Sequence, residues 1–400
     1  MRSHLLIFFL CVVAAGIFTL PASLSPASAL LGYPGDNYQH AWFVWHFAKA
    51  AASGHNPFYT HLLFYPARTK LAWTTLDPLA GILALPLSLI AGPVIAYNFS
   101  LILQLALAAF FARLLCSRIC RNEIAALFGG IAFGLGPFLL AHALGHLSLA
   151  TASPIPLYVL ALDNLLRKET PSWKDGMLAG LALLLTALAH YNYTVFCIML
   201  TAVILAVDFA IASAINRRDL LKRTWLALTV AAATFVAAFS PLLVILLRDR
   251  ADVPTPRTMA HVVQYSADVF GFLIPSWNNV LFGGFAHGLD ARIFVAGFEG
   301  TVYAGPIVLL LAAIGFWKGR CMERQWVMRA AVATIIFYLL SLGPEIHILG
   351  RLTGISGPAA LLYHFRFARF VSVPARFNVI VMLCLAILSA IGLAWCLDNL

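Results

Sequence analysis

Apolar runs long enough to form membrane-crossing helices recur along the whole chain, and polar segments separate them. An α-helix needs about 20 predominantly apolar residues to cross the hydrocarbon core of a bilayer. The pattern therefore predicts an all-α fold: a polytopic transmembrane helix bundle of about ten spans, with juxtamembrane helices and loops on the outer face. The predicted spans are residues 4–24, 94–115, 123–141, 147–166, 175–191, 193–213, 224–247, 304–317, 327–343 and 375–397.

The composition agrees with a membrane protein. Hydrophobic residues make up 62% of the 400 residues and charged residues only 10%, whereas about a quarter of the residues of a soluble domain are charged. The formal net charge of +10 is typical of a membrane protein whose cytoplasmic loops are rich in Lys and Arg. The sequence contains no basic run or motif that indicates nucleic-acid binding, so we expect the lipid bilayer, and no nucleic acid, among its partners.

One shorter apolar segment, residues 78–92, decides the topology, because a crossing there would invert every later span. Pro78, Pro86 and Gly92-Pro93 interrupt it, and we interpret it as a half-buried or re-entrant helix on the outer face. The amino terminus is then cytoplasmic, and so are four short loops that together hold 14 Lys and Arg, as the positive-inside rule requires. These loops are residues 113–122, 167–174, 214–223 and 318–329.

Three long loops then lie outside, at about residues 25–93, 248–303 and 344–374, and 11 of the 12 His fall there or at the outer membrane edge. We therefore expect a multi-pass protein of the cell (inner) membrane whose polar chemistry is periplasmic or extracellular. Residues 1–24 favour an uncleaved first span, and a signal peptide with Ala27-Ser28-Ala29 as a cleavage-like site is the alternative.

The same pattern suggests three consecutive parts. Residues 1–247 form a transmembrane module that includes the first outer loop, residues 248–303 form a large outer loop, and residues 304–400 form the C-terminal transmembrane helices.

The first outer loop begins with a carboxylate close to the membrane surface. Asp36 precedes a predicted juxtamembrane helix from about Asn37 to Ala52, whose aromatic residues suit the headgroup region. Asp36 is either the N-cap of this helix, accepting hydrogen bonds from its first N–H groups, or a functional carboxylate. His40 lies one turn later and makes a small polar cluster with it, which favours a functional role.

Further along the outer side, several cations and His are candidates for substrate binding. Arg68 and Lys70 follow aromatic residues at the outer interface, and either hold a lipid phosphate or anchor the loop. His142 and His146 have the i, i+4 spacing of metal ligands, but Gly145 between them argues against one continuous helix, and lining of an outer cavity is the favoured interpretation.

The two later outer loops hold the remaining candidates, Asp268, Glu299, Arg369 and Arg376. A guanidinium at the depth of Arg376, where the last span begins, suits bidentate binding of a phosphate, and an interfacial anchor is the alternative. Asp208 is an acid within an apolar run. It lies near the cytoplasmic end, so we expect it to reach the interface or to pair with Arg217 or Arg218.

The order of several short motifs resembles the GT-C superfamily of polytopic membrane glycosyltransferases, and more narrowly a group of bacterial GT-C-like membrane proteins. The matching elements run through almost the whole chain: Gly35-Asp36, AALFGGIAFGLGPF at 125–138, Gly145-His146, YSADVFGFLIPS at 265–276, Phe298-Glu299-Gly300 with Tyr303 and Gly305, Gly343-Pro344 and Pro374-Ala375-Arg376-Phe377.

The resemblance implies an inverting transferase that uses a polyprenyl-phosphate sugar on the outer face. Asp36 would match the catalytic aspartate as general base on the acceptor hydroxyl. Glu299 and Asp268 would be cavity residues, and Arg376 would be a candidate for the donor phosphate. The acceptor would be an envelope lipid, glycan or protein.

The sequence leaves the metal requirement and two alternative functions open. Asn37 stands where related proteins often have a second acid, so the sequence specifies no cofactor and leaves a divalent metal open. The alternative functions are a lipid or glycan transporter or flippase, and a non-catalytic membrane assembly protein. The one-sided distribution of His and the scarcity of charges within spans favour the transferase.

Overall fold

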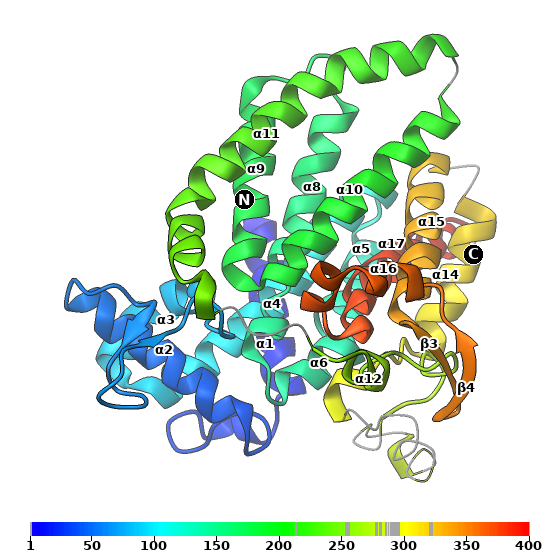
Figure 1. Ribbon diagram of the computed structural model, residues 1–400. Coiled ribbons are helices and arrows are strands. Elements are labelled where there is room, and N and C mark those ends of the chain that lie inside the picture. Colours follow the sequence, from blue (N-terminus) through cyan, green and yellow to red (C-terminus); the bar gives the residue numbers. More distant parts are fainter. Residues whose placement is uncertain are drawn as a thin grey trace. The chain divides into compact units, whose positions relative to one another are not determined.

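The computed structural model describes residues 2–212, 214–252, 257–276, 279, 282–284, 286, 288, 297–319 and 323–399. His287 and Arg320, which contributed to the predicted topology, lie outside the described residues, and so do the side chains of Arg217 and Arg218. The chain is mainly helical (Figure 1). It forms two compact units that are interleaved along the sequence, and each is described by itself.

Unit 1 comprises Met1–Phe111, Ala143–Ile198 and Ala212–Pro254. α4 and α10 contribute residues to both units. The elements of unit 1 are α1 (Arg2–Phe18), α2 (Asp36–Ala52), β1 (Tyr59–Thr60), β2 (Thr69–Lys70), α3 (Pro78–Ala91), most of α4 (Pro93–Cys120), α7 (Leu147–Ala150), α8 (Pro154–Arg167), α9 (Trp173–Ala189), the first part of α10 (Tyr191–Ile211) and α11 (Ala214–Arg248).

Local sequence signals set the ends of α3, the helix predicted to be half-buried or re-entrant. The Asp77 side chain caps it by accepting a hydrogen bond from the Ala80 N–H at 2.8 Å, and Pro78 occupies the first turn, where no N–H is needed. Gly92 ends the helix with a φ of 85°, a conformation that favours glycine. Pro93 then begins α4 in a new direction. The break between residues 92 and 93 is thus confirmed.

Glycines let α9 and α11 approach closely within unit 1. A Cβ atom added at Gly176 or Gly180 would lie 2.4 Å from the backbone oxygen of Ala227 or Ala231 on α11. Such contacts between small residues are how helices associate in a membrane, where lipid tails give no hydrophobic driving force.

Unit 2 comprises Ala112–His142, Met199–Ile211 and Thr255–Leu400. Besides parts of α4 and α10, its elements are α5 (Glu123–Gly134), α6 (Pro137–Ala143), α12 (Met259–Gln264), α14 (Pro306–Lys318), α15 (Arg324–Ser341), the antiparallel hairpin of β3 (Glu345–Ile348) and β4 (Arg351–Ser356), α16 (Ala360–His364), and α17 (Asn378–Asn399). Short 3-10 helices at Gly297–Gly300, Arg366–Phe370 and Pro374–Phe377 connect them.

The core of unit 2 is built on α17, which packs against α5, α14 and α15. At the contact with α14, a Cβ at Gly315 would lie 2.0 Å from the Leu388 oxygen, and one at Gly392 would lie 2.0 Å from the Leu311 oxygen. Both positions therefore accept only glycine without a shift of the helices.

Arg217 and Arg218, the predicted partners of Asp208, have side chains outside the described residues, and Asp208 pairs with Arg329. The two carboxylate oxygens of Asp208 accept hydrogen bonds from the Arg329 guanidinium at 2.7 and 2.5 Å, and Gln325 donates a third at 3.1 Å. All three residues belong to unit 2. A buried carboxylate needs a buried cation with matching geometry, and α15 supplies it, whereas sequence proximity had suggested Arg217 or Arg218.

The predicted juxtamembrane helix is confirmed by α2, which spans Asp36–Ala52. The sequence had suggested that the aromatic residues of this helix face a headgroup region. Phe43 and Phe47 are instead buried in unit 1. Phe43 packs with Leu71 and Leu76, and Phe47 contacts Gly81 on α3. The burial of two aromatic rings, each with a large apolar surface, stabilises this contact.

Among the described residues, six helices are long and apolar enough to cross a bilayer. They are Pro93–Cys120, Glu123–Ala143, Leu147–Arg167, Tyr191–Ile211, Thr224–Arg248 and Pro374–Asn399. Three further apolar helices are shorter: His4–Phe18, Pro78–Ala91 and Pro306–Lys318. The molecule is therefore a polytopic membrane protein, and the count of ten spans and the orientation stay predictions.

Candidate functional site

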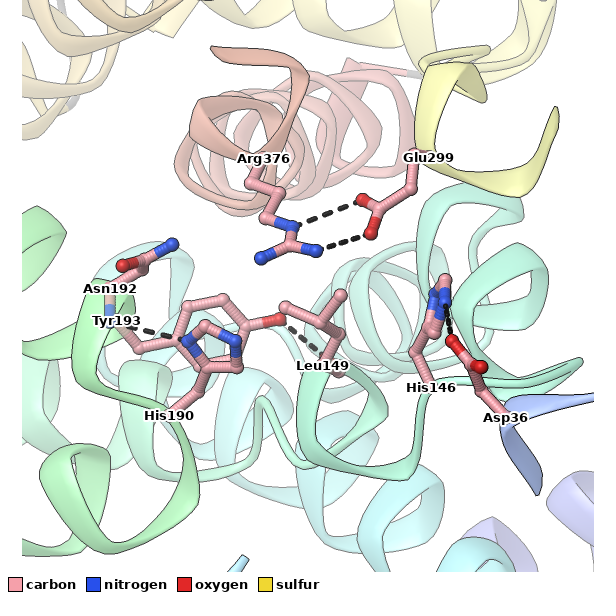
Figure 2. Close-up of polar contacts among 8 residues, drawn as sticks. All are labelled: Asp36, His146, Leu149, His190, Asn192, Tyr193, Glu299 and Arg376. Carbon is pink, nitrogen blue, oxygen red and sulfur yellow. Dashed lines mark hydrogen bonds and ion pairs between the residues drawn. The ribbon is translucent and has the colours of Figure 1, made fainter. Parts of the chain in front are cut away.

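Asp36 is not the N-cap of α2. The helix begins at Asp36 itself, and Gly35 holds the N-cap position with a φ of 156° and no side-chain hydrogen bond. The Asp36 carboxylate extends instead to His146, whose Nε2 lies 3.2 Å from Oδ2 (Figure 2). The Asp36 side chain remains 63% exposed. The carboxylate is therefore accessible to a reacting group.

The chain fold brings His146 to Asp36 within unit 1. α6 ends at Ala143 and α7 begins at Leu147, with His146 at the N-cap position of α7. The helix break that Gly145 predicted is thus confirmed. The loop is held to the first outer loop because the Tyr33 N–H donates to the Leu144 oxygen at 2.7 Å. Gly32 makes this approach possible, since a Cβ there would lie 2.3 Å from the same oxygen.

His40, one turn after Asp36, is buried and packs edge-on against Phe43 at 6.1 Å between ring centroids. Burial, together with a smaller contribution from the nearby His146, lowers the pKa of His40 from 6.5 to about 3. His40 is therefore a neutral imidazole at physiological pH. Because His40 is buried, it packs beside the Asp36–His146 pair and is not an exposed substrate contact.

A second hydrogen-bonded turn of unit 1 lies between α9 and α10. The Asn192 N–H donates to His190 Nδ1 at 3.2 Å, which assigns the ring proton to Nε2 when the ring is neutral. The Tyr193 hydroxyl donates to the Leu149 oxygen of α7 (Figure 2). This contact fixes α7, and with it the backbone that carries His146.

In unit 2, Arg376 and Glu299 form the second polar pair drawn in Figure 2. Arg376 Nε donates to Glu299 Oε2 at 3.0 Å, and Nη2 donates to Oε1. Both side chains are largely buried. Sequence reasoning selected both residues but not their pairing. A bidentate Arg–carboxylate pair occupies the same planar donor face that a phosphate would use.

His142 also belongs to unit 2 and is fully buried, with its ring edge-on to Phe138 at 4.6 Å. A ring nitrogen of His142 and a carboxylate oxygen of Glu299 lie within 4.8 Å of each other. An imidazole and a carboxylate at that distance fit two ligands of a divalent cation, but a complete site needs four or more. In unit 1, Asp36 and His146 likewise pair a carboxylate with an imidazole.

The other predicted site residues have contacts typical of the protein scaffold. Asp268 is buried, and its oxygens accept the Phe270 and Gly350 N–H groups, both at 2.8 Å. Arg369 donates to the Tyr363 oxygen at 3.1 Å. These contacts favour a role in holding the loops of unit 2 over direct substrate binding.

Arg68 and Lys70 likewise contact protein groups of unit 1. The Arg68 guanidinium lies 4.2 Å from the centroid of the Tyr59 ring, and Lys70 Nζ lies 3.6 Å from Asp249 Oδ1. Neither residue lies in the Asp36–His146 contact. Of the two interpretations left open by the sequence, these contacts favour anchoring of the loop over a dedicated phosphate site.

Asp77 is the titratable group that sequence reasoning missed. It is buried at the start of α3, and burial raises its pKa from 3.8 to about 7, although the Ala80 N–H and the Thr151 hydroxyl lower it. The signal was present, because an Asp before a Pro that starts an apolar helix is a buried N-cap. A capping role alone does not show how strongly burial raises the pKa of the Asp77 carboxyl.

A family model matches residues 6–399, which is nearly the whole chain, and its description is Domain of unknown function (DUF6311). The chain belongs to this family. Comparison with curated proteins found no match. The order of helices and loops in this DUF6311 protein is similar to that of a solved membrane enzyme.

That structure is the archaeal oligosaccharyltransferase AglB from Archaeoglobus fulgidus, in complex with an inhibitory peptide and a dolichol-phosphate. The similarity has a TM-score of 0.54 at 11% sequence identity, and it covers 99% of this chain. The chain spans 50% of the length of the archaeal protein. The likeness therefore establishes a GT-C-like fold, which confirms the predicted fold class.

Proposed function

We propose that this DUF6311 protein is a membrane glycosyltransferase. It transfers a sugar from a polyprenyl-phosphate donor to a hydroxyl of an envelope lipid, glycan or protein on the outer face of the cell membrane. The observation that carries the proposal is the contact between Asp36 and His146 at 3.2 Å, in which the carboxylate does not cap its helix. The GT-C-like fold supports the same reaction class, and the dolichol-phosphate bound by the structural neighbour supports a lipid-linked donor.

In the proposed reaction, Asp36 is the general base. The acceptor oxygen attacks the anomeric carbon while its proton moves to the Asp36 carboxylate. The bond between this carbon and the phosphate oxygen breaks, and its electron pair leaves with the polyprenyl phosphate. Attack on the face opposite to the leaving group inverts the configuration. The donor bond supplies the driving force, so no nucleotide takes part in the step.

His146 orients the base. When it donates from Nε2 to Asp36 Oδ2, the second carboxylate oxygen is directed to the acceptor. The turn held by Tyr193 and Leu149 fixes α7, and α7 carries His146 at its N-cap. Neutral His40 next to this pair adds no positive charge that would weaken the base.

We propose Arg376 of unit 2 as a phosphate-binding cation, as the family resemblance implies. Its guanidinium is pre-oriented by the bidentate contact with Glu299, which lowers the entropy lost on binding an anion. Because Glu299 already neutralises part of its charge, Arg376 binds a phosphate by sharing its donors or by exchanging the carboxylate for the phosphate. The Glu299→Gln variant separates these cases. It should weaken binding of the sugar donor if Glu299 stays in place and orients Arg376. It should not weaken that binding if the phosphate displaces the carboxylate.

A strain that lacks this protein tests the reaction class. Mass spectrometry of its envelope lipids, glycans and proteins should reveal the loss of one sugar, with build-up of the lipid-linked donor. The wild-type chain should restore the sugar, and Asp36→Ala at equal protein level should not. An unchanged envelope in the deletion strain, or full restoration by Asp36→Ala, would contradict the proposal.

A further inference from the structure

The hairpin of β1 and β2 in unit 1 carries a group of exposed apolar side chains at its tip. Residues 61–68 form this tip, and Leu62, Phe64 and Tyr65 within it are 59%, 82% and 83% exposed. Large apolar residues clustered outside a core mark an interaction surface. This group is separate from the Asp36–His146 pair, so the proposed glycosyl transfer does not account for it.

Hydrogen bonds within the tip hold it in a defined conformation. Phe64 has a φ of 54°, a left-handed conformation that is rare for an aromatic residue. The Ala67 N–H donates to the Phe64 oxygen at 3.0 Å, and the Thr69 hydroxyl donates to the Leu63 oxygen at 2.8 Å. These bonds hold the backbone in the strained turn that leaves the Phe64 ring outside.

The base of the hairpin fixes its position in unit 1. Leu63 and Phe58 pack on the cluster of Phe43, Leu71 and Leu76, which includes a residue of α2. The next helix along the chain, α3, exposes Ile82, Leu89 and Ile90, the last at 85%. In the sequence the hairpin lies between α2 and α3, two helices that pack against each other and are labelled in Figure 1.

Charge selects the chemistry of the partner. Between Asp36 and Asp77 the sequence contains Lys49, Arg68 and Lys70 and no acidic residue. Arg68 is exposed next to the apolar tip, with its guanidinium over the Tyr59 ring. Lys70 is paired with Asp249, so Arg68 is the cation of the tip itself. Apolar side chains next to an exposed guanidinium complement the headgroup region of an anionic bilayer, where aromatic rings enter the interface and guanidinium groups meet phosphates.

We propose that the β1–β2 tip, residues 61–68, inserts into the headgroup region of an anionic bilayer and anchors the first outer loop there. Leu62, Phe64 and Tyr65 enter the interface, and Arg68 contacts lipid phosphates. The surface is a membrane contact of the loop that carries Asp36. It is independent of the identity of the sugar and of whether Asp36 is a base.

The test places an environment-sensitive fluorescent amino acid at position 65 by stop-codon suppression and reconstitutes the whole chain in nanodiscs. Lipids with a nitroxide near the headgroup should quench it, and aqueous iodide should quench it weakly. The same label at Glu169, an exposed acid in the loop before α9, should respond in the opposite way. A second label at Phe64 guards against misfolding at one position.

The lipid chemistry is tested with the same label. Quenching by the nitroxide lipid should increase when anionic lipid replaces zwitterionic lipid, and Arg68→Gln should reduce this increase. Strong iodide quenching without lipid quenching would overturn the proposal and place the tip in water. Protection from both quenchers would also overturn it, because the tip would then be covered by protein.

Discussion

At the scale of single residues, two buried groups of unit 1 respond to acid in opposite directions. The pKa of His40 is lowered from 6.5 to about 3, so the unfolded chain binds a proton that the folded protein excludes, and the free energy of unfolding falls as the pH decreases from 6.5 towards 3. The pKa of Asp77 is raised from 3.8 to about 7. The folded protein keeps that proton, so the free energy of unfolding falls as the pH increases from 3.8 towards 7.

The Asp77→Asn variant should therefore become more sensitive to acid than the wild type. Asn keeps an oxygen for the Ala80 N–H and removes the opposing titration, so the destabilisation that His40 contributes is no longer offset, with a slope of up to about 1.4 kcal/mol per pH unit between pH 6.5 and 4. Thermal unfolding in detergent from pH 4 to 7 measures this difference. Asp398→Asn, an exposed matched control, should follow the wild type. Parallel curves for Asp77→Asn and wild type would contradict the two opposing shifts.

Residue types and their order selected Asp36, Glu299 and Arg376 as candidates from the sequence, but did not predict their contacts. Asp36 and His146 are 110 residues apart, and a pair at that separation depends on how the turn after α6 packs on the first outer loop. Asp208 illustrates the same limit, since its partner Arg329 is 121 residues away and was not predicted. Charge patterns along the chain find buried ions, and tertiary packing chooses their partners.

At the scale of elements, apolar runs and helix-breaking residues predicted most helices. Gly92-Pro93 and Gly145 ended helices as expected. The orientation of α2 was not predictable, because a helix rich in aromatic residues suits either an interface or a protein contact. The close approach of Gly81 to Phe47, which the sequence does not encode locally, decides for the protein contact.

The contact of α14 with α17 gives a prediction at this scale. Gly315→Ala should destabilise the protein by about 1–3 kcal/mol, because the new Cβ would lie 2.0 Å from the Leu388 oxygen and the helices must separate. Gly16→Ala on α1, where a Cβ meets nothing within 4 Å, should be neutral or slightly stabilising, since Ala favours helix more than Gly. Unfolding of both variants in detergent measures the contrast. Equal stability of the two would contradict the packing.

At the scale of the whole molecule, hydropathy and loop charge predicted a polytopic bundle, and six helices are long and apolar enough to cross a membrane. The GT-C-like fold was predictable because the motifs that carry the resemblance occur in order along almost the whole chain. The number of spans depends on shorter helices such as α3, whose length alone does not decide whether they cross.

A topology reporter fused after Arg121 tests the predicted orientation. The loop after α4 belongs to the set that holds 14 Lys and Arg, so the reporter should give a cytoplasmic signal. A reporter placed after Gly54, which follows α2, should give an outside signal as its counterpart. An outside signal after Arg121 would place Asp36 on the wrong face for an outer-face transferase.

The measurement that tests the central claim most directly is sugar transfer by Asp36→Asn in proteoliposomes that contain the lipid extract of the source membrane. This variant keeps the shape of the side chain and removes its ability to accept a proton, so the rate should fall by about 10²–10⁴-fold, the range of general-base catalysis. Asp36→Ala should be at least as slow, and Asp398→Asn should retain wild-type transfer at equal protein level. Retained transfer by Asp36→Asn would contradict the role of Asp36 as the base.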